Sequence, residues 1–394
     1  MHISQRALNT SPSPTLAITS LARRLKSEGV DIASFAAGEP DFDTPQHIKD
    51  AAVKALAEGF TKYTPSSGTD QLRDAVAAKF KRDSGLTYTR EQIIVSCGAK
   101  HSLFNAILAV CDPGDEVIIL APYWVTYPEQ VKLAGGKPII VNCSSENNYQ
   151  PTREQLQSAV TNRTRAIIIN SPGNPTGAVY SRQTLKEIAS IAIQHNLIVI
   201  SDEIYEKIIY DGNEHISIAS LGSDIKALTI MINGCSKAYA MTGWRIGYAA
   251  STDNDLIKAM GRLQDQSTSN PTSIAQAAAT TALNGPEDEI HRMVAAFDER
   301  RRVIVEILNE MPGVSCRMPG GAFYAFAHIG ELLKKSGLKG SDALAELLLK
   351  EARVAVIPGS GFGADDHIRL SYATSMEAIT QGLGRMHQVI KNLG

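Results

Sequence analysis

The chain has 394 residues, with 39 lysines and arginines against 41 aspartates and glutamates, so its formal net charge is −2. Hydrophobic residues make up 43% of the sequence and charged residues 20%, which is typical of a globular protein and not of a disordered one. A chain of this length predicts two or three domain-sized units. The near-zero net charge argues against nucleic acid and membrane surfaces as partners, because binding them needs a basic field.

The sequence contains no apolar stretch of the roughly 18 residues that a membrane helix needs, and residues 1–15 lack the apolar core of a signal peptide. The cysteines are odd in number and widely separated, without a C-x-x-C pair: Cys97, Cys111, Cys143, Cys235 and Cys316. This pattern indicates a reducing compartment, without a disulfide framework or a zinc site. We therefore expect a cytoplasmic protein that holds no metal.

Helix-like and strand-like segments alternate from about residue 41 onward. The helical spacing of apolar residues predicts helices over 48–58 and 71–82. Short runs rich in β-branched residues predict strands, separated by helical segments, at 92–96, 116–120, 137–141, 166–170, 197–201, 228–232 and 246–250. Several of these runs are apolar at every position, as in strands that are covered on both faces. They predict a mainly parallel sheet in a doubly wound α/β layer.

The pattern changes after about residue 286. A long charged helix is predicted over 287–310, and strand-like and helical runs then follow at 314–317, 323–327, 341–352, 354–357 and 367–371, with a last helix from Met376. These elements predict a second, smaller α+β lobe. Because no low-complexity linker precedes it, we expect the two lobes to pack against each other.

Three segments at the ends of predicted strands are rich in groups that bind ligands, at the edge where open α/β sheets place them. SCGAK at 96–100 opens a helix with small residues, whose free N–H groups could bind an anion together with Lys100. SPGNPTG at 171–177 holds the amide of Asn174 between prolines and glycines, and SDEIYE at 201–206 places Asp202 and Tyr205 on one turn. Taken singly, each segment also fits an ordinary turn or a helix N-cap.

A fourth segment, CSKAYAMTGWR at 235–245, contains Lys237 between a predicted strand and apolar residues. Lysines are normally solvated, but a shielded lysine has a lowered pKa and can form Schiff bases. Arg245 adds a second cation. Together the four segments offer an anion cradle, an acid, a phenol, an amide and a reactive amine. Pyridoxal phosphate needs this set for its phosphate, its ring nitrogen and its aldehyde.

The sequence also resembles the class I aminotransferases of fold type I, and within them the branch of bacterial aspartate aminotransferases. The resemblance runs essentially end to end and is carried by AGEPDFDTP at 37–45, PYW at 122–124, and the segments 171–177 and 237–245. It implies an α/β fold with a mainly parallel seven-stranded sheet in the large lobe and a smaller α+β lobe. The implied domains are an N-terminal arm (1–13), a small domain (14–46 and 290–394) and a large cofactor-binding domain (47–289).

The resemblance implies a role for each residue around pyridoxal 5′-phosphate. Lys237 would hold the cofactor as a Schiff base and move the catalytic proton, and Asp202 would keep the ring nitrogen protonated. Tyr205 and Asn174 would hydrogen-bond the ring oxygen, and Trp124 would stack on the ring. The residues implied around the phosphate are Gly98, Ala99, Lys100, Ser236 and Arg245.

The resemblance also implies how the substrate and a second subunit reach the site. Arg369 and the N–H of Gly38 would bind the substrate's α-carboxylate, with Trp124 and Asn174 beside it. Tyr63 would reach the phosphate in the neighbouring subunit, which implies a homodimer. The expected small-molecule partners are amino acids and 2-oxo acids.

The activity that the resemblance implies is the ping-pong transfer of the amino group from L-aspartate to 2-oxoglutarate, giving oxaloacetate and L-glutamate. One departure concerns the second carboxylate of these substrates. Relatives often carry a basic residue just ahead of a P-S-x-T segment, where Ser11 stands here, and Ser13 and Thr15 offer only hydroxyls. The alternatives are an aminotransferase for aromatic amino acids or for prephenate/arogenate and, less favoured, a β-lyase.

Two other classes of protein are less consistent with the sequence. The first is a nicotinamide-dependent dehydrogenase, because GSGFGA at 359–364 fits the glycine pattern of a dinucleotide site. However, a strand-like run follows this segment in place of a helix, so a plain turn is expected. A cofactor-binding transcriptional regulator would need a DNA-binding domain, for which the chain shows no room before Ser34 and no basic helix pair.

Overall fold

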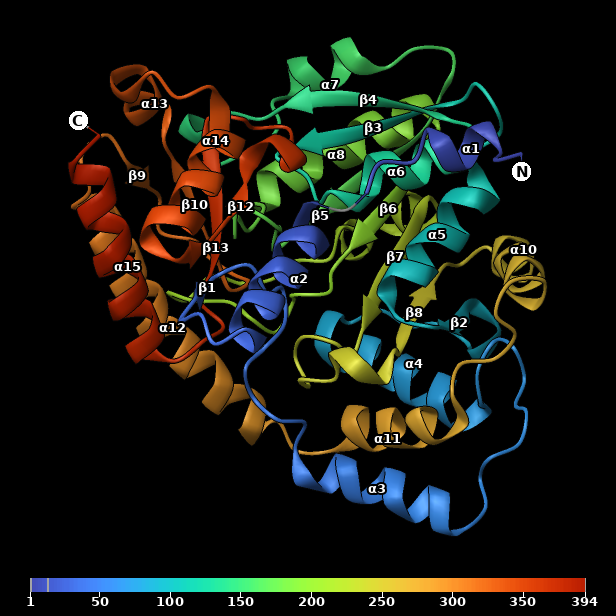
Figure 1. Cartoon of the computed structure of the whole chain (residues 1–394). Coiled ribbons are helices and arrows are strands. Elements are labelled where there is room, and N and C mark those ends of the chain that lie inside the picture. Colours follow the sequence, from blue (N-terminus) through green and yellow to red (C-terminus); the bar gives the residue numbers. More distant parts are fainter. Residues whose placement is uncertain (1, 13, 394) are drawn as a thin grey trace.

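The computed structural model describes residues 2–12 and 14–393, and its larger lobe is built on a seven-stranded sheet (Figure 1). The strands lie in the order β2-β8-β7-β6-β5-β3-β4. β8 runs antiparallel to both of its neighbours, whereas the other neighbouring pairs are parallel. The strands are β2 (Ile93–Ser96), β3 (Glu116–Ala121), β4 (Lys137–Asn142), β5 (Thr164–Asn170), β6 (Ile198–Asp202), β7 (Thr229–Gly234) and β8 (Gly247–Ala250). The predicted mainly parallel α/β sheet is confirmed.

Helices cover both faces of this sheet, because successive strand residues point to opposite faces and both sets are apolar (Figure 1). Ile94 packs in the core beneath α5 (Ala99–Val110), α6 (Thr126–Leu133) and α10 (Asn254–Asp265). On the opposite face, Val95 packs with α4 (Asp70–Ser84) and α11 (Ser273–Asn284), and Ile167 packs with α7 (Arg153–Ala159) and α8 (Arg182–His195). Two further helices complete this lobe: α3 (Gln46–Ala57) and α9 (Ser223–Ala227).

The smaller lobe contains a four-stranded antiparallel sheet in the order β12-β13-β10-β9 and a two-stranded parallel sheet of β1 and β11. The strands are β1 (Ala33–Ser34), β9 (Ser315–Cys316), β10 (Tyr324–His328), β11 (Val354–Ala355), β12 (Ile357–Pro358) and β13 (His367–Ser371). Its helices are α2 (Pro14–Ser27), α12 (Asp288–Asn309), α13 (Gly330–Ser336), α14 (Gly340–Leu347) and α15 (Met376–Lys391). Because β1 pairs with β11, residues from the start and the end of the chain share this lobe.

One prediction for the small lobe was wrong in detail. The apolar run 354–357 forms two short strands in different sheets, since Val354 pairs with β1 and Ile357 pairs with β13. Apolarity alone does not reveal which partner a strand residue has. The helix predicted over 341–352 is confirmed: it forms α14 as far as Leu347 and then a π-helical turn over Leu348–Ala352. The glycine-rich segment at 359 is a short 3-10 turn that leads directly into β13, as expected for a plain turn.

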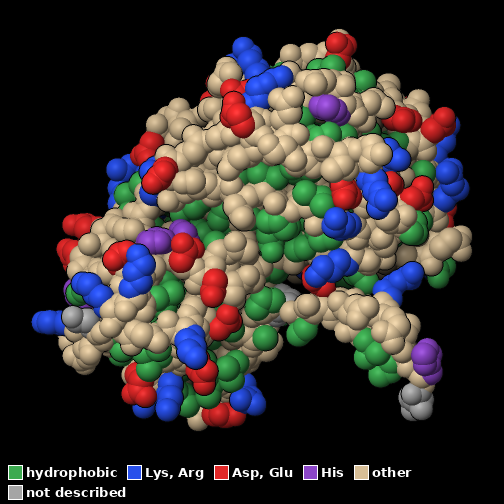
Figure 2. All heavy atoms as spheres, turned by 90° about the horizontal axis from the view of Figure 1, so that it is seen from above, with side chains coloured by type: hydrophobic (Ala, Val, Ile, Leu, Met, Phe, Trp, Pro, Cys, Tyr) green, Lys and Arg blue, Asp and Glu red, His purple; other side chains and the backbone are tan. Residues whose placement is uncertain are grey.

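The N-terminal segment stands away from the body of the molecule (Figure 2). It contains the short helix α1 (Gln5–Leu8), on which no residue is buried, and Ile3 and Leu8 are both exposed. Farther along, the N–H of Ser11 donates a hydrogen bond to Glu129 Oε2 at 2.9 Å. Within the described part of the chain, no helix is long and apolar enough to cross a membrane.

Candidate active site

A pocket of about 380 Å³ opens at the carboxyl ends of β5, β6 and β7, with α2 and β13 contributing residues to its walls. It gathers residues from each of the four segments that the sequence singled out. The predicted site residues that line it are Gly38, Ala99, Lys100, Trp124, Asn174, Asp202, Tyr205, Ser236, Lys237, Arg245 and Arg369. Their convergence follows from the parallel strands, whose carboxyl ends lie along one edge of the sheet.

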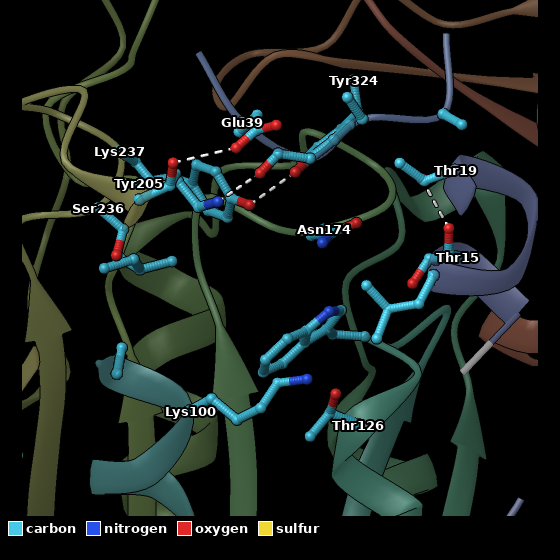
Figure 3. A pocket seen from close by; sticks show the side chains of 18 of the residues that line it. Thr15, Thr19, Glu39, Lys100, Thr126, Asn174, Tyr205, Ser236, Lys237 and Tyr324 are labelled. Atoms are coloured by element: carbon cyan, nitrogen blue, oxygen red, sulfur yellow. Dashed lines mark hydrogen bonds between the residues drawn. The ribbon is translucent and has the colours of Figure 1, made fainter. Parts of the chain in front are cut away.

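Lys237 lies just after β7, with its side chain in the pocket beside Tyr205 and Glu39 (Figure 3). Its amine donates a hydrogen bond to the carbonyl of Gly38, and the ring of Phe323 lies 5.9 Å from it. Burial lowers the pKa of Lys237 to about 8, although the nearby Glu39 carboxylate acts in the opposite direction. The amine is therefore shielded as predicted, and an appreciable fraction is uncharged near neutral pH.

Asp202 is the last residue of β6, and its carboxylate is buried in the pocket wall. Its Oδ2 accepts a hydrogen bond from the hydroxyl of Tyr127 at 2.8 Å, and its Oδ1 accepts one from the N–H of Ile204 at 3.3 Å. Burial raises the pKa of Asp202 to about 6, while both hydrogen bonds favour the ionised form. At neutral pH the group is thus an anion with a fixed direction, which suits a protonated ring nitrogen.

Arg369 extends from β13 of the small lobe and is only 2% exposed. It donates hydrogen bonds of 2.9 Å to Asn174 Oδ1 and to the carbonyl of Ala36, and its guanidinium lies 4.5 Å from the Tyr324 ring. Its Nε is buried without a partner, and no carboxylate of the described residues pairs with this cation. A buried cation without an anion is costly, so the site suits a ligand that brings a carboxylate.

The backbone of Asn174 is held in place by the neighbouring strand ends. Its backbone N–H donates to Asn170 Oδ1 at 2.8 Å, and the Asn170 amide donates to the carbonyl of Asp202 at 2.9 Å. Asn170 is the last residue of β5, so it links the 171–177 segment to β6. Asp202 and Asn174 are therefore both positioned by hydrogen bonds between their backbones and the Asn170 side chain.

An anion cradle forms where α5 begins. Gly98, the N-cap of this helix, has a φ of 90°, and a Cβ there would lie 2.2 Å from Nη2 of Arg245. The glycine therefore allows Arg245 to approach the helix N-terminus, where the first N–H groups, including that of Ala99, lack intrahelical partners. Arg245 itself donates to two backbone carbonyls and pairs with no carboxylate among the described residues. With Ser236 nearby, this arrangement suits a phosphate group.

Only the backbone of Lys100 lies at this cradle. Its side chain extends away from Ser236 toward Thr126, and its ammonium lies 4.7 Å from the centre of the Trp124 ring (Figure 3). Burial, together with the charge of Arg245, lowers the pKa of Lys100. The N–H group of Lys100 and its ammonium therefore serve different parts of the pocket.

Three of the residues considered from the sequence are not part of the pocket lining: Gly98, which directly precedes the lining residue Ala99, Tyr63 and Ser11. Tyr63 is 91% exposed on the surface, and Ser11 contacts Glu129 through its backbone. Thr15 of α2 does line the pocket, whereas Ser13 lies outside the described residues.

The family model for aminotransferases of class I and II matches residues 30–386 of the chain. The chain belongs to this family. It is 50% identical to an aspartate aminotransferase of Bacillus sp. (strain YM-2), over 99% of each chain. It is 45% identical to an aspartate/prephenate aminotransferase of Nitrosomonas europaea, over 99% of this chain and 100% of that one. The crystal structure of an aspartate aminotransferase from Rhizobium meliloti matches with a TM-score of 0.96 at 42% identity, over 100% of both chains.

Several pocket residues of this aminotransferase were not identified from the sequence. Tyr127 holds Asp202, and the Tyr324 hydroxyl lies 2.8 Å from that of Tyr205. Arg23 and Glu39 form an ion pair of 3.2 Å at the pocket. A usable signal existed for Tyr127, because it lies one helical turn after Trp124, and for Glu39, because it follows Gly38 directly. Tyr324 and Arg23 lie in segments whose composition does not predict that they reach the pocket.

Proposed function

We propose that this aminotransferase uses pyridoxal 5′-phosphate to transfer the amino group of L-aspartate to 2-oxoglutarate. The observation that carries the proposal is the buried Arg369, which lacks a carboxylate among the described residues and shares one pocket with Lys237 and Asp202. An amine, an acid and a carboxylate-binding cation are the groups that amino-acid chemistry on this cofactor needs. The names of the relatives from Bacillus and Rhizobium support aspartate as the substrate.

The residues present fit the cofactor. The cradle of Gly98, Ala99, Ser236 and Arg245 would hold its phosphate, and Asp202 would pair with its ring nitrogen. Trp124 would stack on the ring, while Tyr205 and Asn174 would contact the ring oxygen. When bound, the cofactor would supply an aldehyde that bonds to Lys237 and a ring that accepts electrons from the substrate's Cα.

The chain's own residues would then perform the binding and the proton transfer. Arg369 and the N–H of Gly38 would hold the α-carboxylate and orient the Cα–H bond toward Lys237. Because burial lowers its pKa to about 8, Lys237 can accept the proton of Cα at Nζ and return it later in the cycle. Asp202, fixed by Tyr127, would remain ionised throughout this exchange.

A second carboxylate on the substrate would meet Lys100. Its ammonium lies on the side of the pocket lined by Trp124, Thr126 and Thr15, away from the phosphate cradle. This cation provides the positive charge that Ser11 does not, and it supports dicarboxylic substrates such as aspartate. The Nitrosomonas relative, named for aspartate and prephenate, keeps prephenate/arogenate and aromatic amino acids as the second candidate class.

We also propose a homodimer in the cytoplasm. Tyr63 is too exposed to serve its own pocket, and Val53 and Leu56 of the nearby α3 are exposed apolar residues of the kind found in subunit contacts. A neighbouring subunit would cover them and receive Tyr63 near its phosphate. The five cysteines are free thiols, which supports a reducing compartment.

Half-reaction kinetics with single amino acids would test the substrate assignment. We expect the cofactor absorbance to change rapidly with aspartate and glutamate, and slowly with phenylalanine, tyrosine, arogenate and alanine. A Lys100→Gln variant should lose about tenfold in the rate constant for aspartate, or ~1.4 kcal/mol, with little change for phenylalanine. Conversion by alanine but not by aspartate would overturn the dicarboxylate preference, and release of pyruvate with ammonia would indicate a lyase.

A further inference from the structure

Glu39 spans the mouth of the pocket and contacts both lobes. It lies in the loop after β1, and its Oε1 is 3.2 Å from Nη2 of Arg23 on α2. Its Oε2 accepts a hydrogen bond of 3.0 Å from the hydroxyl of Thr242, in the turn of the large lobe that precedes Arg245. A single carboxylate thereby bridges α2 and the phosphate-binding side of the pocket.

The same carboxylate lies beside Lys237 (Figure 3). The Lys237 amine donates to the carbonyl of Gly38, the residue that immediately precedes Glu39, so the backbone holds the two groups close together. Four charged groups act on this amine: Glu39 and Asp202 favour its protonated form, whereas Arg369 and Arg245 disfavour it. Among these charges, Glu39 has the largest influence on the pKa of Lys237.

Stabilisation of the fold does not explain this arrangement well. The side chains of Glu39 and Arg23 are 44% and 73% exposed, and exposed ion pairs contribute little to stability. The position of the pair does suit a functional role, because both residues line the pocket and one of them neighbours the reactive lysine.

We infer that Glu39 is a positioning residue, which bridges the lobes across the pocket mouth and sets the proton affinity of Lys237, and that Arg23 limits its effect. The inference rests on the proposed function, in which Lys237 must both accept and return a proton. A carboxylate alone would hold the proton on the lysine too firmly. The positive charge of Arg23 offsets part of the electrostatic effect of Glu39. The Lys237 amine can then both accept and release a proton.

Two substitutions separate this role from a structural one. Glu39→Gln removes the negative charge and keeps a hydrogen-bond acceptor for Thr242, whereas Arg23→Gln leaves the Glu39 charge without its cation. In the holoenzyme we expect the pH midpoint of the lysine-bound cofactor's visible absorption to fall by about half a pH unit in Glu39→Gln. In Arg23→Gln the midpoint should rise.

Matched controls come from the neighbouring pair on the same segment, Arg24 and Glu28, which lie 3.8 Å apart in solvent. Arg24→Gln and Glu28→Gln should leave the midpoint unchanged. Shifts in the same direction for Glu39→Gln and Arg23→Gln, or no shift in either, would overturn the inference. If Glu39→Gln does not fold, the rise expected for the exposed Arg23→Gln still decides the matter.

The outcomes also separate this inference from the proposed function. A coloured holoenzyme that converts aspartate, but whose midpoint does not respond to these two changes, would refute the role of Glu39 alone. A wild-type protein that binds no cofactor would refute the proposed function, and the inference with it.

Discussion

The large-lobe side of the pocket and its α2 side differ in how firmly their side chains are held. Asp202 and Asn174 are buried, and they accept hydrogen bonds from the buried Tyr127 and Arg369. On the α2 side, Arg23 and Glu39 are partly exposed and contact each other at the pocket mouth. Groups that act on every substrate are thus buried and firmly held, whereas groups that adjust proton affinity or select side chains are more accessible.

Arg369 shows that this division follows burial and not lobe membership. It belongs to the small lobe, yet it is as buried as the strand-end residues of the large lobe and contacts Asn174 directly. An α-carboxylate is common to all amino-acid substrates, so a fixed cation suits it. The side chains vary, and the cations that would meet them, such as Lys100, need less rigid placement.

The largest effect is expected on the rigid side, from Lys237→Ala. Removal of the amine eliminates both the covalent link to the cofactor and the group that moves the Cα proton, and proton transfer alone contributes about 10²–10⁴-fold. We expect transamination to fall by at least that factor while cofactor still binds through the phosphate cradle. Single-turnover absorbance measurements with aspartate would show it, and near-native turnover would remove Lys237 from this role.

The second-largest loss of activity is expected from Arg369→Gln. Loss of a buried charged partner costs about 2–5 kcal/mol, so kcat/KM should fall by about 30-fold or more for aspartate and phenylalanine alike. The exposed Arg317→Gln, in the same lobe, is the control and should change neither value. A loss confined to aspartate would mean that Arg369 binds the side-chain carboxylate of the substrate. The contrast drawn between the two walls of the pocket would then be wrong.

A smaller effect is expected from Tyr127→Phe, which removes the 2.8 Å hydrogen bond to Asp202. The pKa of Asp202 is about 6, raised by burial, and this bond opposes the rise. Without the bond the pKa should increase by about one unit, since hydrogen bonds to charged groups contribute ~1.5–3 kcal/mol. The acid limb of the kcat/KM profile should therefore move to higher pH, because the ionised form is the active one.

The half-buried Tyr123, which does not bond to Asp202, supplies the control for that measurement. Tyr123→Phe should leave the acid limb in place. If Tyr127→Phe lowers the rate equally at all pH values, Tyr127 supports the wall of the pocket without tuning Asp202.

The rigid side could largely be predicted from the sequence. Apolar β-branched runs mark the buried strands, and parallel strands bring their carboxyl ends together, so Asp202, Asn174 and Lys237 were expected to converge. These positions depend on local pattern and sheet geometry. The family resemblance added their roles around the cofactor and identified Arg369, on a strand predicted from the residue pattern, as the residue that binds the α-carboxylate.

The accessible side could not be predicted in the same way. The direction of the Lys100 side chain depends on its packing against Trp124, and the pairing of Arg23 with Glu39 depends on how α2 crosses the pocket. The split of 354–357 into two strands has a similar cause, because Val354 and Ile357 find partners far away in the chain. Each of these features is a long-range contact, for which composition and periodicity carry no signal.

Borohydride reduction of the holoprotein tests most directly whether Lys237 is the cofactor-binding residue of this pocket. After reduction, proteolysis and mass spectrometry, we expect the visible absorption to be lost and one pyridoxyl group to be found on Lys237. An adduct on another lysine, or a protein that stays colourless after addition of pyridoxal 5′-phosphate, would contradict the proposed function.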